Sequence, residues 1–175
     1  LFTNYNKVQV NFMARLNSDG TLDTNFTAQA TGVINGVTYI AADNAVYAIA
    51  IQDDGRIVLG GDFGTFAGVT RNRITRLNSD GSIDSAINFG TGANSFVGAI
   101  VLQRSSLYLE QLVIGGGFTS YNGSTEDYIA RVNGGSIAGG GRLEFTSASY
   151  SIVEANTNAT ITIRRTGGTA GYATN

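Results

Sequence analysis

ARLNSDGTLD at residues 14–23 and TRLNSDGSID at residues 75–84 are nearly the same phrase, with their arginines 61 positions apart. A shorter version, ARVNGGS, stands at residues 130–136, and its arginine follows 55 positions later. Each arginine is preceded by a phenylalanine at a constant distance of 13 residues: Phe2, Phe63 and Phe118. Self-similarity at such spacing predicts a chain built from repeated supersecondary units, each packed on its neighbours.

The second unit shows what one repeat contains. The apolar run AVYAIAI leads to Gln52, the turn residues 53–55 follow, and a strand over residues 57–59 leads into Gly60 and Gly61. Asp-Gly between apolar runs is a hairpin signal, because type I′ turns need positive φ at both central residues.

The remainder of that unit predicts two more strands. A loop leads to a strand around residues 73–77, which the turn residues 78–81 close, and a short fourth strand is expected at residues 82–87. Three or four short antiparallel strands in each unit are typical of propeller blades. The runs AVYAIAI and GAIVL (residues 98–102) are apolar at every position, so we expect them to be inner strands with both faces covered.

The repeated phrases resemble the delta-60 repeat over residues 1–136, which hold two complete units and a partial first one. This resemblance implies antiparallel blades of a β-propeller in a large bacterial protein that is secreted or lies at the cell surface. Because a propeller typically needs four to eight blades, we expect this chain to be part of a longer polypeptide or to pack against neighbouring subunits.

Composition excludes several kinds of site within the chain. The 175 residues include no Cys and no His, so disulfides, Ser-His-Asp triads and His-based zinc sites are impossible. The net charge of −2 and the lack of a basic cluster argue against nucleic-acid binding. No apolar run reaches the ~20 residues of a membrane-spanning helix.

A change of composition after the third unit predicts a second module. Residues 137–142 form a Gly-rich linker, and residues 143–175 contain apolar runs such as the alternating ATITIRR at residues 159–165. The stretch LEFTSASYSIVEANTNATITIRRTGG resembles the opening strands of a Calx-beta domain, an immunoglobulin-like β-sandwich. The fold class is therefore all-β, with partial propeller-like blades followed by the first strands of a sandwich.

Two repeated acidic motifs are calcium candidates. Asp19 and Asp23 lie in N-x-D-G-x-x-D, and Asp80 and Asp84 repeat the motif one unit later. Oxygen ligands at alternate positions around a glycine turn resemble a calcium loop, although each motif has too few oxygens for a complete shell. The alternative is an Asx-stabilised turn in which these carboxylates bond backbone amides.

Glu154 is a further calcium candidate, because the Calx-beta resemblance implies a metal-binding Glu at this position. The alternative is a surface glutamate at a strand end.

The arginines of the three phrases, Arg15, Arg76 and Arg131, allow two interpretations. They could form a ring that binds anions, or they could be structural, each paired with a nearby carboxylate or carbonyl. Recurrence at one place in each unit favours the structural role.

These observations favour a non-catalytic structural or adhesive module, outside the cell or on its surface, that presents loops at residues 64–72 and 121–127. The first alternative is a propeller with a discrete carbohydrate- or protein-binding site, with calcium as its possible cofactor. The second is a fragment of a propeller enzyme whose catalytic residues lie elsewhere.

Overall fold

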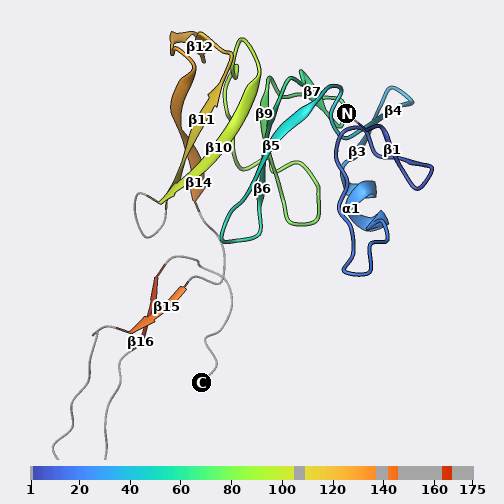
Figure 1. The fold of residues 1–175 in the computed structure, drawn as a ribbon, viewed down its shortest axis with the longest axis horizontal. Coiled ribbons are helices and arrows are strands. Elements are labelled where there is room, and N and C mark those ends of the chain that lie inside the picture. Colours follow the sequence, from blue (N-terminus) through green and yellow to red (C-terminus); the bar gives the residue numbers. More distant parts are fainter. Residues whose placement is uncertain (1, 105–108, 137–141, 146–162, 167–175) are drawn as a thin grey trace, which may run out of the picture.

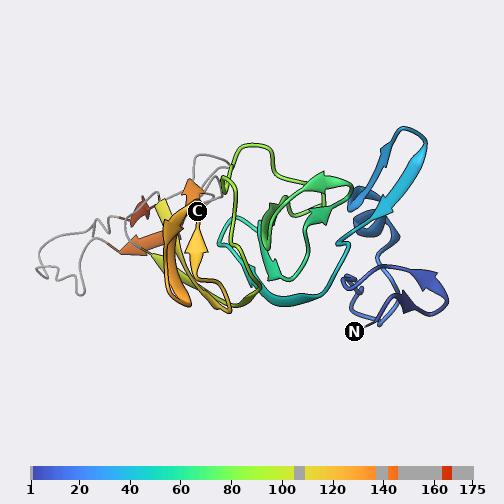
Figure 2. The ribbon, with the colours of Figure 1, turned by 90° about the horizontal axis from the view of Figure 1, so that it is seen from above.

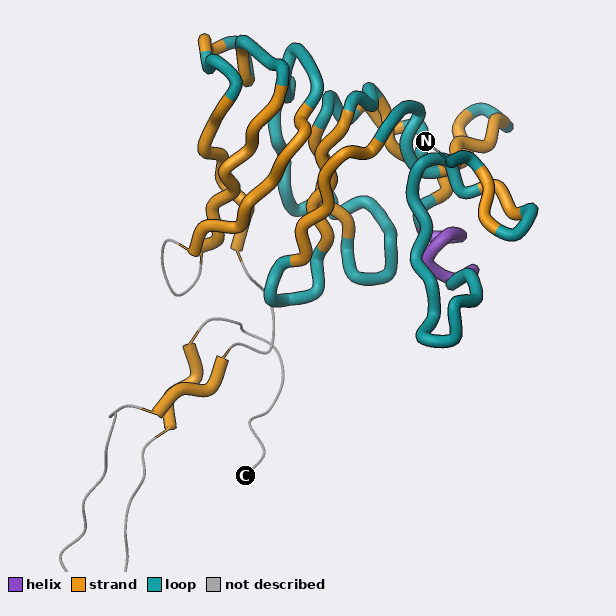
Figure 3. The backbone as a smooth tube through the Cα atoms, viewed as in Figure 1, coloured by secondary structure: helices purple, strands orange, loops and turns teal. Residues whose placement is uncertain are grey.

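The computed structural model describes residues 2–104, 109–136, 142–145 and 163–166. In chain order the strands are β1 (Asn4–Tyr5), β2 (Val8–Gln9), β3 (Thr31–Ile34), β4 (Val37–Ile40), β5 (Val46–Ile51), β6 (Ile57–Gly61), β7 (Thr65–Phe66), β8 (Val69–Thr70), β9 (Ile74–Leu77), β10 (Val97–Arg104), β11 (Leu109–Gly116), β12 (Ser120–Tyr121), β13 (Ser124–Thr125), β14 (Ile129–Ser136), β15 (Arg142–Phe145) and β16 (Ile163–Thr166). A short helix, α1 (Thr24–Gln29), follows the first repeated phrase. Every strand pairing in the described part is antiparallel, and the tube in Figure 3 is mostly strand and loop, which confirms the all-β prediction.

Two three-stranded sheets form the body of the molecule, with strand orders β5-β6-β9 and β10-β11-β14. In each sheet the strand that leads to the repeated glutamine lies at one edge, and the strand that carries the repeated arginine lies at the other. The sheets stand side by side, with β10 next to β5 (Figure 1). This arrangement is consistent with partial propeller blades.

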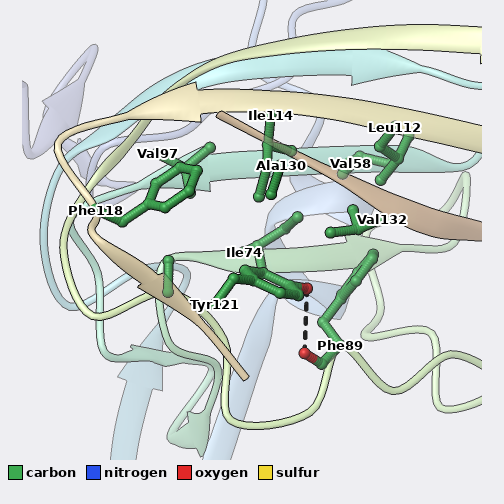
Figure 4. Packing of buried hydrophobic residues seen from close by; sticks show 11 residues of the cluster. Val58, Ile74, Phe89, Val97, Leu112, Ile114, Phe118, Tyr121, Ala130 and Val132 are labelled. Carbon is green, nitrogen blue, oxygen red and sulfur yellow. Dashed lines mark hydrogen bonds between the residues drawn. The ribbon is translucent and has the colours of Figure 1, made fainter. Parts of the chain in front are cut away.

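Stacking buries both faces of β6, the central strand of the second unit's sheet. Val58 and Leu59 are adjacent on β6, so their side chains point to opposite faces, and both are 0% exposed. Val58 belongs to a cluster between the two sheets that includes Val97, Leu112 and Ile114 (Figure 4). Leu59 belongs to a second cluster, on the side of the first unit, together with Met13, Phe26, Phe63, Phe66 and Leu77. The three units therefore form a continuous stack.

The repeated Gly-Gly pair has a packing reason. A Cβ on Gly60 would lie 2.7 Å from Cγ1 of Val97, which belongs to the next unit. Glycine at this point of β6 lets the neighbouring sheet approach closely.

The repeated turns adopt a geometry other than the predicted type I′. In the turns that Gly20, Gly55 and Gly81 end, the glycine amide donates to the carbonyl three residues earlier, and the glycine has positive φ. This is a type I turn followed by a left-handed glycine, the usual three-residue hairpin loop. The tips of the shorter hairpins, such as Asn122-Gly123 between β12 and β13, have two consecutive positive φ angles, as type I′ requires.

Three sequence predictions on strands need correction. The short fourth strand expected at residues 82–87 is reduced to a single bridge between Leu77 and Ile83. The loops after the Gly-Gly pair contain small hairpins, β7–β8 and β12–β13, that periodicity over such short runs could not predict. The inner strands are not covered on both faces, since Ile49 and Ile51 on β5 are 57% and 64% exposed.

A hairpin formed by β3 and β4 interrupts the regular repeat. The distance from Asp23 to Gln52 is ten residues longer than that from Asp84 to Gln103, and the hairpin Thr31–Ile40 has that length. Figure 2 shows it projecting from the stack. Val33 at 68% and Val37 at 53% are among its exposed apolar side chains.

The region predicted to be a second module, residues 143–175, is described at residues 143–145 and 163–166. β15 pairs with β16 in an antiparallel ladder. The Gly-rich linker lies outside the described residues except for Arg142, as does most of the stretch on which the Calx-beta resemblance depends. Within the described part, none of the helical structure has the length and hydropathy that a membrane span needs.

Replacing Leu59 with alanine should reduce the free energy of unfolding by about 2–5 kcal/mol, because the side chain is fully buried and a cavity would remain. Urea denaturation monitored by circular dichroism measures this change. Val33→Ala is the control, and its effect should stay within about 0.5 kcal/mol because Val33 is exposed. Equal effects of the two substitutions would contradict the stacked core.

Candidate functional site

Arg76 on β9 is the centre of a polar network between the second and third units. Its side chain is 3% exposed, and its Nε and Nη2 lie 2.8 and 2.7 Å from Oδ2 of Asp84. Nη1 donates to the Gly134 carbonyl of the third unit and, at 3.2 Å, to Oε1 of Gln52. A buried guanidinium is stable only where its charge and its N–H donors are satisfied. Arg76 therefore holds Asp84 and Gln52 of the second unit and the Gly134 carbonyl of the third unit in fixed positions.

Gln52 and Glu110 complete the contact between the units. The Gln52 amide nitrogen donates to Oε2 of Glu110 at 2.8 Å and to the Gly134 carbonyl at 3.1 Å. Gln52 and Glu110 are 2% and 0% exposed. Glu110 therefore brings a carboxylate from β11 into the interface that Arg76 organises.

A second arginine joins the network at its outer side. Arg56 Nε lies 3.0 Å from Oδ2 of Asp84, and its Nη1 pairs with Asp54. The Asp84 carboxylate also accepts a hydrogen bond from the Ala86 amide at 2.8 Å. One carboxylate thus holds two guanidinium groups and one turn of backbone.

Arg15 makes a more exposed version of the same contact between the first and second units. It pairs with Asp23 at 2.8 Å, donates to the Ser79 carbonyl, and lies 4.3 Å above the Phe26 ring. Ser79 and Gly134 occupy the same position in successive units, 55 residues apart. Arg15 and Arg76 therefore each donate to the closing turn of the unit that follows, which confirms the structural interpretation for these two arginines. Arg131 is exposed.

Asp19 and Asp80, two of the predicted calcium ligands, bond within their own turns. Asp19 Oδ1 accepts from Thr21 Oγ1 at 2.6 Å and from the Thr21 amide at 2.9 Å. Asp80 makes the same pair of contacts with Ser82, at 2.7 and 2.9 Å. In both cases the hydroxyl contact, followed by the amide contact, lowers the pKa of the carboxyl below its ordinary value. These contacts match the Asx-turn alternative.

Asp23 and Asp84, the other two calcium candidates from the repeats, accept hydrogen bonds from backbone amides and pair with arginines. Asp23 caps α1 through the Phe26 amide at 3.0 Å; this contact, followed by the Arg15 guanidinium, lowers the pKa of the Asp23 carboxyl. In the part of the chain that the structure describes, no three acidic side chains gather as a metal site would require. Glu154 lies outside the described residues, so its calcium role stays a prediction.

Two neighbouring hollows open beside β9, one along the connection of residues 84–92 and one between Asn72 and the β12–β13 hairpin of the third unit. One, of about 260 Å³, is lined by Arg71, Asn72 and Asn88, with Arg76 and Asp84 of the network also in its wall. The other, of about 300 Å³, shares Asn72 and Gly92 with the first and extends towards Ser120. The donors and acceptors in these walls suit a polar ligand more than an apolar one.

Tyr121 anchors the third unit close to these hollows. It is 8% exposed, and its hydroxyl donates to the Phe89 carbonyl at 3.1 Å (Figure 4). Burial raises the pKa of Tyr121 to about 12.

Sequence reasoning found the arginines and their carboxylates but missed the partners across the interface. Gln52 was visible as a repeated residue, although nothing in the repeat indicated what it binds. Glu110 has no counterpart in the second unit, where Gly55 occupies that position, so repetition could not reveal it. The Gly134 carbonyl belongs to the backbone and has no residue-type signal at all.

The family described as "Domain of unknown function (DUF5122) beta-propeller" matches residues 1–26, 52–86 and 111–135. Each stretch overlaps one of the repeated phrases, and together they include Gln52, Arg76, Asp84 and Gly134 of the network but not Glu110. No curated protein and no solved structure matches the chain.

Arg76→Ala should lower the free energy of unfolding by about 3–5 kcal/mol, because it leaves the buried carboxylate of Asp84 with less compensation. Arg15→Ala is the matched control at the equivalent position. Its cost should be about 1 kcal/mol or less, since the Arg15 side chain is 41% exposed. Urea denaturation of both variants tests this order, and a larger loss for Arg15→Ala would contradict it.

The raised pKa of Tyr121 predicts a loss of stability in alkali. The folded protein keeps the phenol proton up to about pH 12, whereas the unfolded chain releases it near pH 10.0. Stability from this group is therefore complete below pH 10.0 and falls above it, by up to about 1.4 kcal/mol per pH unit. Tyr121→Phe should remove this part of the loss of stability above pH 10.0. It should also remove the rise in tyrosinate absorbance that occurs at the highest pH in the titration of the folded protein. An unchanged absorbance titration would show that Tyr121 is not protected.

Proposed function

We propose, starting from the DUF5122 beta-propeller domain that much of the described chain carries, that this protein is a non-catalytic structural and adhesive module. The proposal extends to a large bacterial protein that is secreted or lies at the cell surface. The observation that carries it is the contrast between a rigid stack, held by the Arg76 network, and an exposed apolar hairpin that interrupts the repeat.

Rigidity supports the scaffold part of the proposal. Buried clusters fill the spaces on both sides of β6, and ion pairs with nearly buried side chains fix the outer edge. The Arg76 guanidinium and the acidic side chains described above are occupied in turns, a helix cap and ion pairs. Such contacts favour structure over acid–base catalysis.

The hairpin β3–β4 supports the adhesive part. Its ten residues carry no charge, and Val33, Val37 and Tyr39 are exposed. Ile34 and Tyr39 lie close to Gly68, at the tip of the β7–β8 hairpin within the predicted loop 64–72. We infer that the two hairpins together contact a protein partner, because exposed apolar side chains gathered on one projection favour protein contacts.

The finer family assignments belong to the same proposal. Residues 1–136 are taken as delta-60-type repeats, and residues 143–175 as the start of a Calx-beta-like sandwich in which Glu154 serves calcium. The partners then include the remainder of a longer polypeptide or neighbouring subunits, besides the surface ligand.

A second candidate function is carbohydrate binding, which the hollow of about 260 Å³ between β9 and the connection of residues 84–92 favours. Arg71, Asn72 and Asn88 in its wall present the planar polar groups that bind sugar hydroxyls.

Deleting residues 31–40 tests the adhesive proposal. The Ala41 amide donates to the Ala30 carbonyl at 2.8 Å, so the ends of the hairpin already meet and a short glycine link should preserve the fold. We expect the intact chain to bind at least one of immobilised collagen, fibronectin or laminin saturably. The deletion variant should lose this binding while its circular dichroism still shows the folded β-structure, although the loss of Ile40 from the second cluster lowers its melting temperature. Each measurement is repeated with calcium and with a chelator.

A glycan array separates the two candidates, and Asn72→Ala is the matched variant. Binding to glycans that survives the deletion and is lost in Asn72→Ala would favour the carbohydrate site. Absence of binding to both proteins and glycans would contradict both functions.

A further inference from the structure

The β3–β4 hairpin is a two-stranded sheet whose outer edges are unprotected. Within the described residues, β3 and β4 form strand pairs only with each other. Their register runs without a bulge from the pair Thr31–Ile40 to the pair Ile34–Val37. The ten residues of the hairpin carry no charge, and the chain contains no proline. An edge of this kind is a template for pairing with another strand.

The other edge strands of residues 2–136 carry the usual protections against such pairing. β1, β2, β7, β8, β12 and β13 have two residues each. β5 and β10 each contain an irregularity of register near their first residue. β9 and β14 carry the charged residues Arg76 and Arg131. Short length, bulges and charges are the devices by which natural sheets prevent edge-to-edge contact, so the inserted hairpin stands apart as the edge that is built to pair.

The backbone of β4 offers the hydrogen-bonding groups for an added strand. Hydrogen-bonded and non-hydrogen-bonded pairs alternate along an antiparallel ladder. The Ala41 amide donates to the Ala30 carbonyl, so the pair Val33–Thr38, three steps closer to the tip, is a non-hydrogen-bonded one. The amide and the carbonyl of Thr38 therefore point away from β3. β4 is also the more exposed strand, since three of its four residues are exposed against two in β3.

We propose that β4 pairs antiparallel with β4 of a second copy of this chain, with Thr38 opposite the partner's Thr38. Two-fold symmetry then places Val37 opposite the partner's Tyr39, in a non-hydrogen-bonded pair whose side chains lie close together. Aromatic with β-branched residues, and threonine with threonine, are favourable cross-strand pairs. Because the hairpin is uncharged, self-pairing brings no like charges of the ribbon together.

This dimer deepens the proposed adhesive function, on which it rests for the role of the hairpin, by naming a second copy as a partner. A lone two-stranded hairpin is marginally stable in water, and further strands stabilise it. Val37 and Tyr39 are 53% and 38% exposed, so both have surface for a partner to cover. The tip of the β7–β8 hairpin supports the Tyr39 ring, since a Cβ on Gly68 would lie 2.8 Å from it. An edge this short buries a small area, so the dimer should dissociate on dilution.

Sedimentation velocity of the intact chain at increasing concentration measures the association. We expect a monomer that converts to a dimer between about 1 μM and 1 mM. Thr38→Lys should weaken the dimer about tenfold or more, because two ammonium groups would lie directly opposite each other. Val33→Lys is the matched control, because Val33 pairs with Thr38 but lies on β3. Its two charges would be three strand spacings apart, about 14 Å, where salt screens them, so the dimer should persist.

Two further variants test the register. Thr38→Glu alone should weaken the dimer as Thr38→Lys does, but a mixture of the two variants should restore it, because opposite charges then face each other. The chain has no cysteine, so Thr38→Cys introduces a single thiol. Mild oxidation should link Thr38→Cys chains into a covalent dimer much faster than Val33→Cys chains. Circular dichroism of each variant verifies folding.

The proposal is overturned if the intact chain stays monomeric at about 1 mM, or if Thr38→Lys leaves the dimer unchanged. It is overturned as well if Val33→Lys weakens the dimer equally, or if the mixture of oppositely charged variants stays monomeric. The measurements contain no matrix protein or glycan. A chain that stays monomeric but binds a matrix protein contradicts this inference alone, whereas a dimer that binds none contradicts the adhesive proposal alone.

Discussion

The Arg76 guanidinium extends out of its own sheet and donates to a backbone carbonyl of the next unit, while its other nitrogens stay on Asp84. A buried charge tolerates little displacement, because each lost partner leaves it desolvated without compensation. The carbonyl must therefore be held where the guanidinium ends, which fixes the turn at Gly134. This constraint sets the separation of the sheets, and the tight packing at Gly60 follows from it.

The same contact shows why a repeat can vary in its turns but not in its arginine. Arg15 reaches the Ser79 carbonyl and Arg76 reaches that of Gly134, so the residue that supplies the carbonyl changes from serine to glycine without loss of the hydrogen bond. A backbone acceptor depends on the path of the chain and not on residue type. The third closing turn can therefore lack the aspartate of the other two, and Gly135 then lies against the Arg76 side chain.

Much of the architecture could be predicted from sequence because it depends on repetition. Repeated arginine, glutamine and Gly-Gly positions located the strands and their order, and the pairing of Arg15 and Arg76 with carboxylates followed from their recurrence. Glu110 could not be predicted because it has no repeated counterpart. The hairpins β7–β8 and β12–β13 could not be predicted because their two-residue strands are too short to show periodicity. The exposure of Ile49 could not be predicted, because the apolar pattern of a sequence indicates a strand but not which neighbouring elements cover its faces. Whether a face is buried depends on the neighbouring unit.

The β3–β4 hairpin interrupts the repeat at a point where an insertion disturbs the stack little. The Ala30 carbonyl and the Ala41 amide are joined by a hydrogen bond of 2.8 Å, so the chain leaves and re-enters the stack at one point. An insertion at such a point costs little, because closing a short loop between ends already in contact requires modest entropy. The Arg76 interface has no such freedom, since an added residue would move the carbonyl away from the guanidinium. Insertions are thus least costly at the hairpins, while the network between the units leaves the sheets little freedom to move apart.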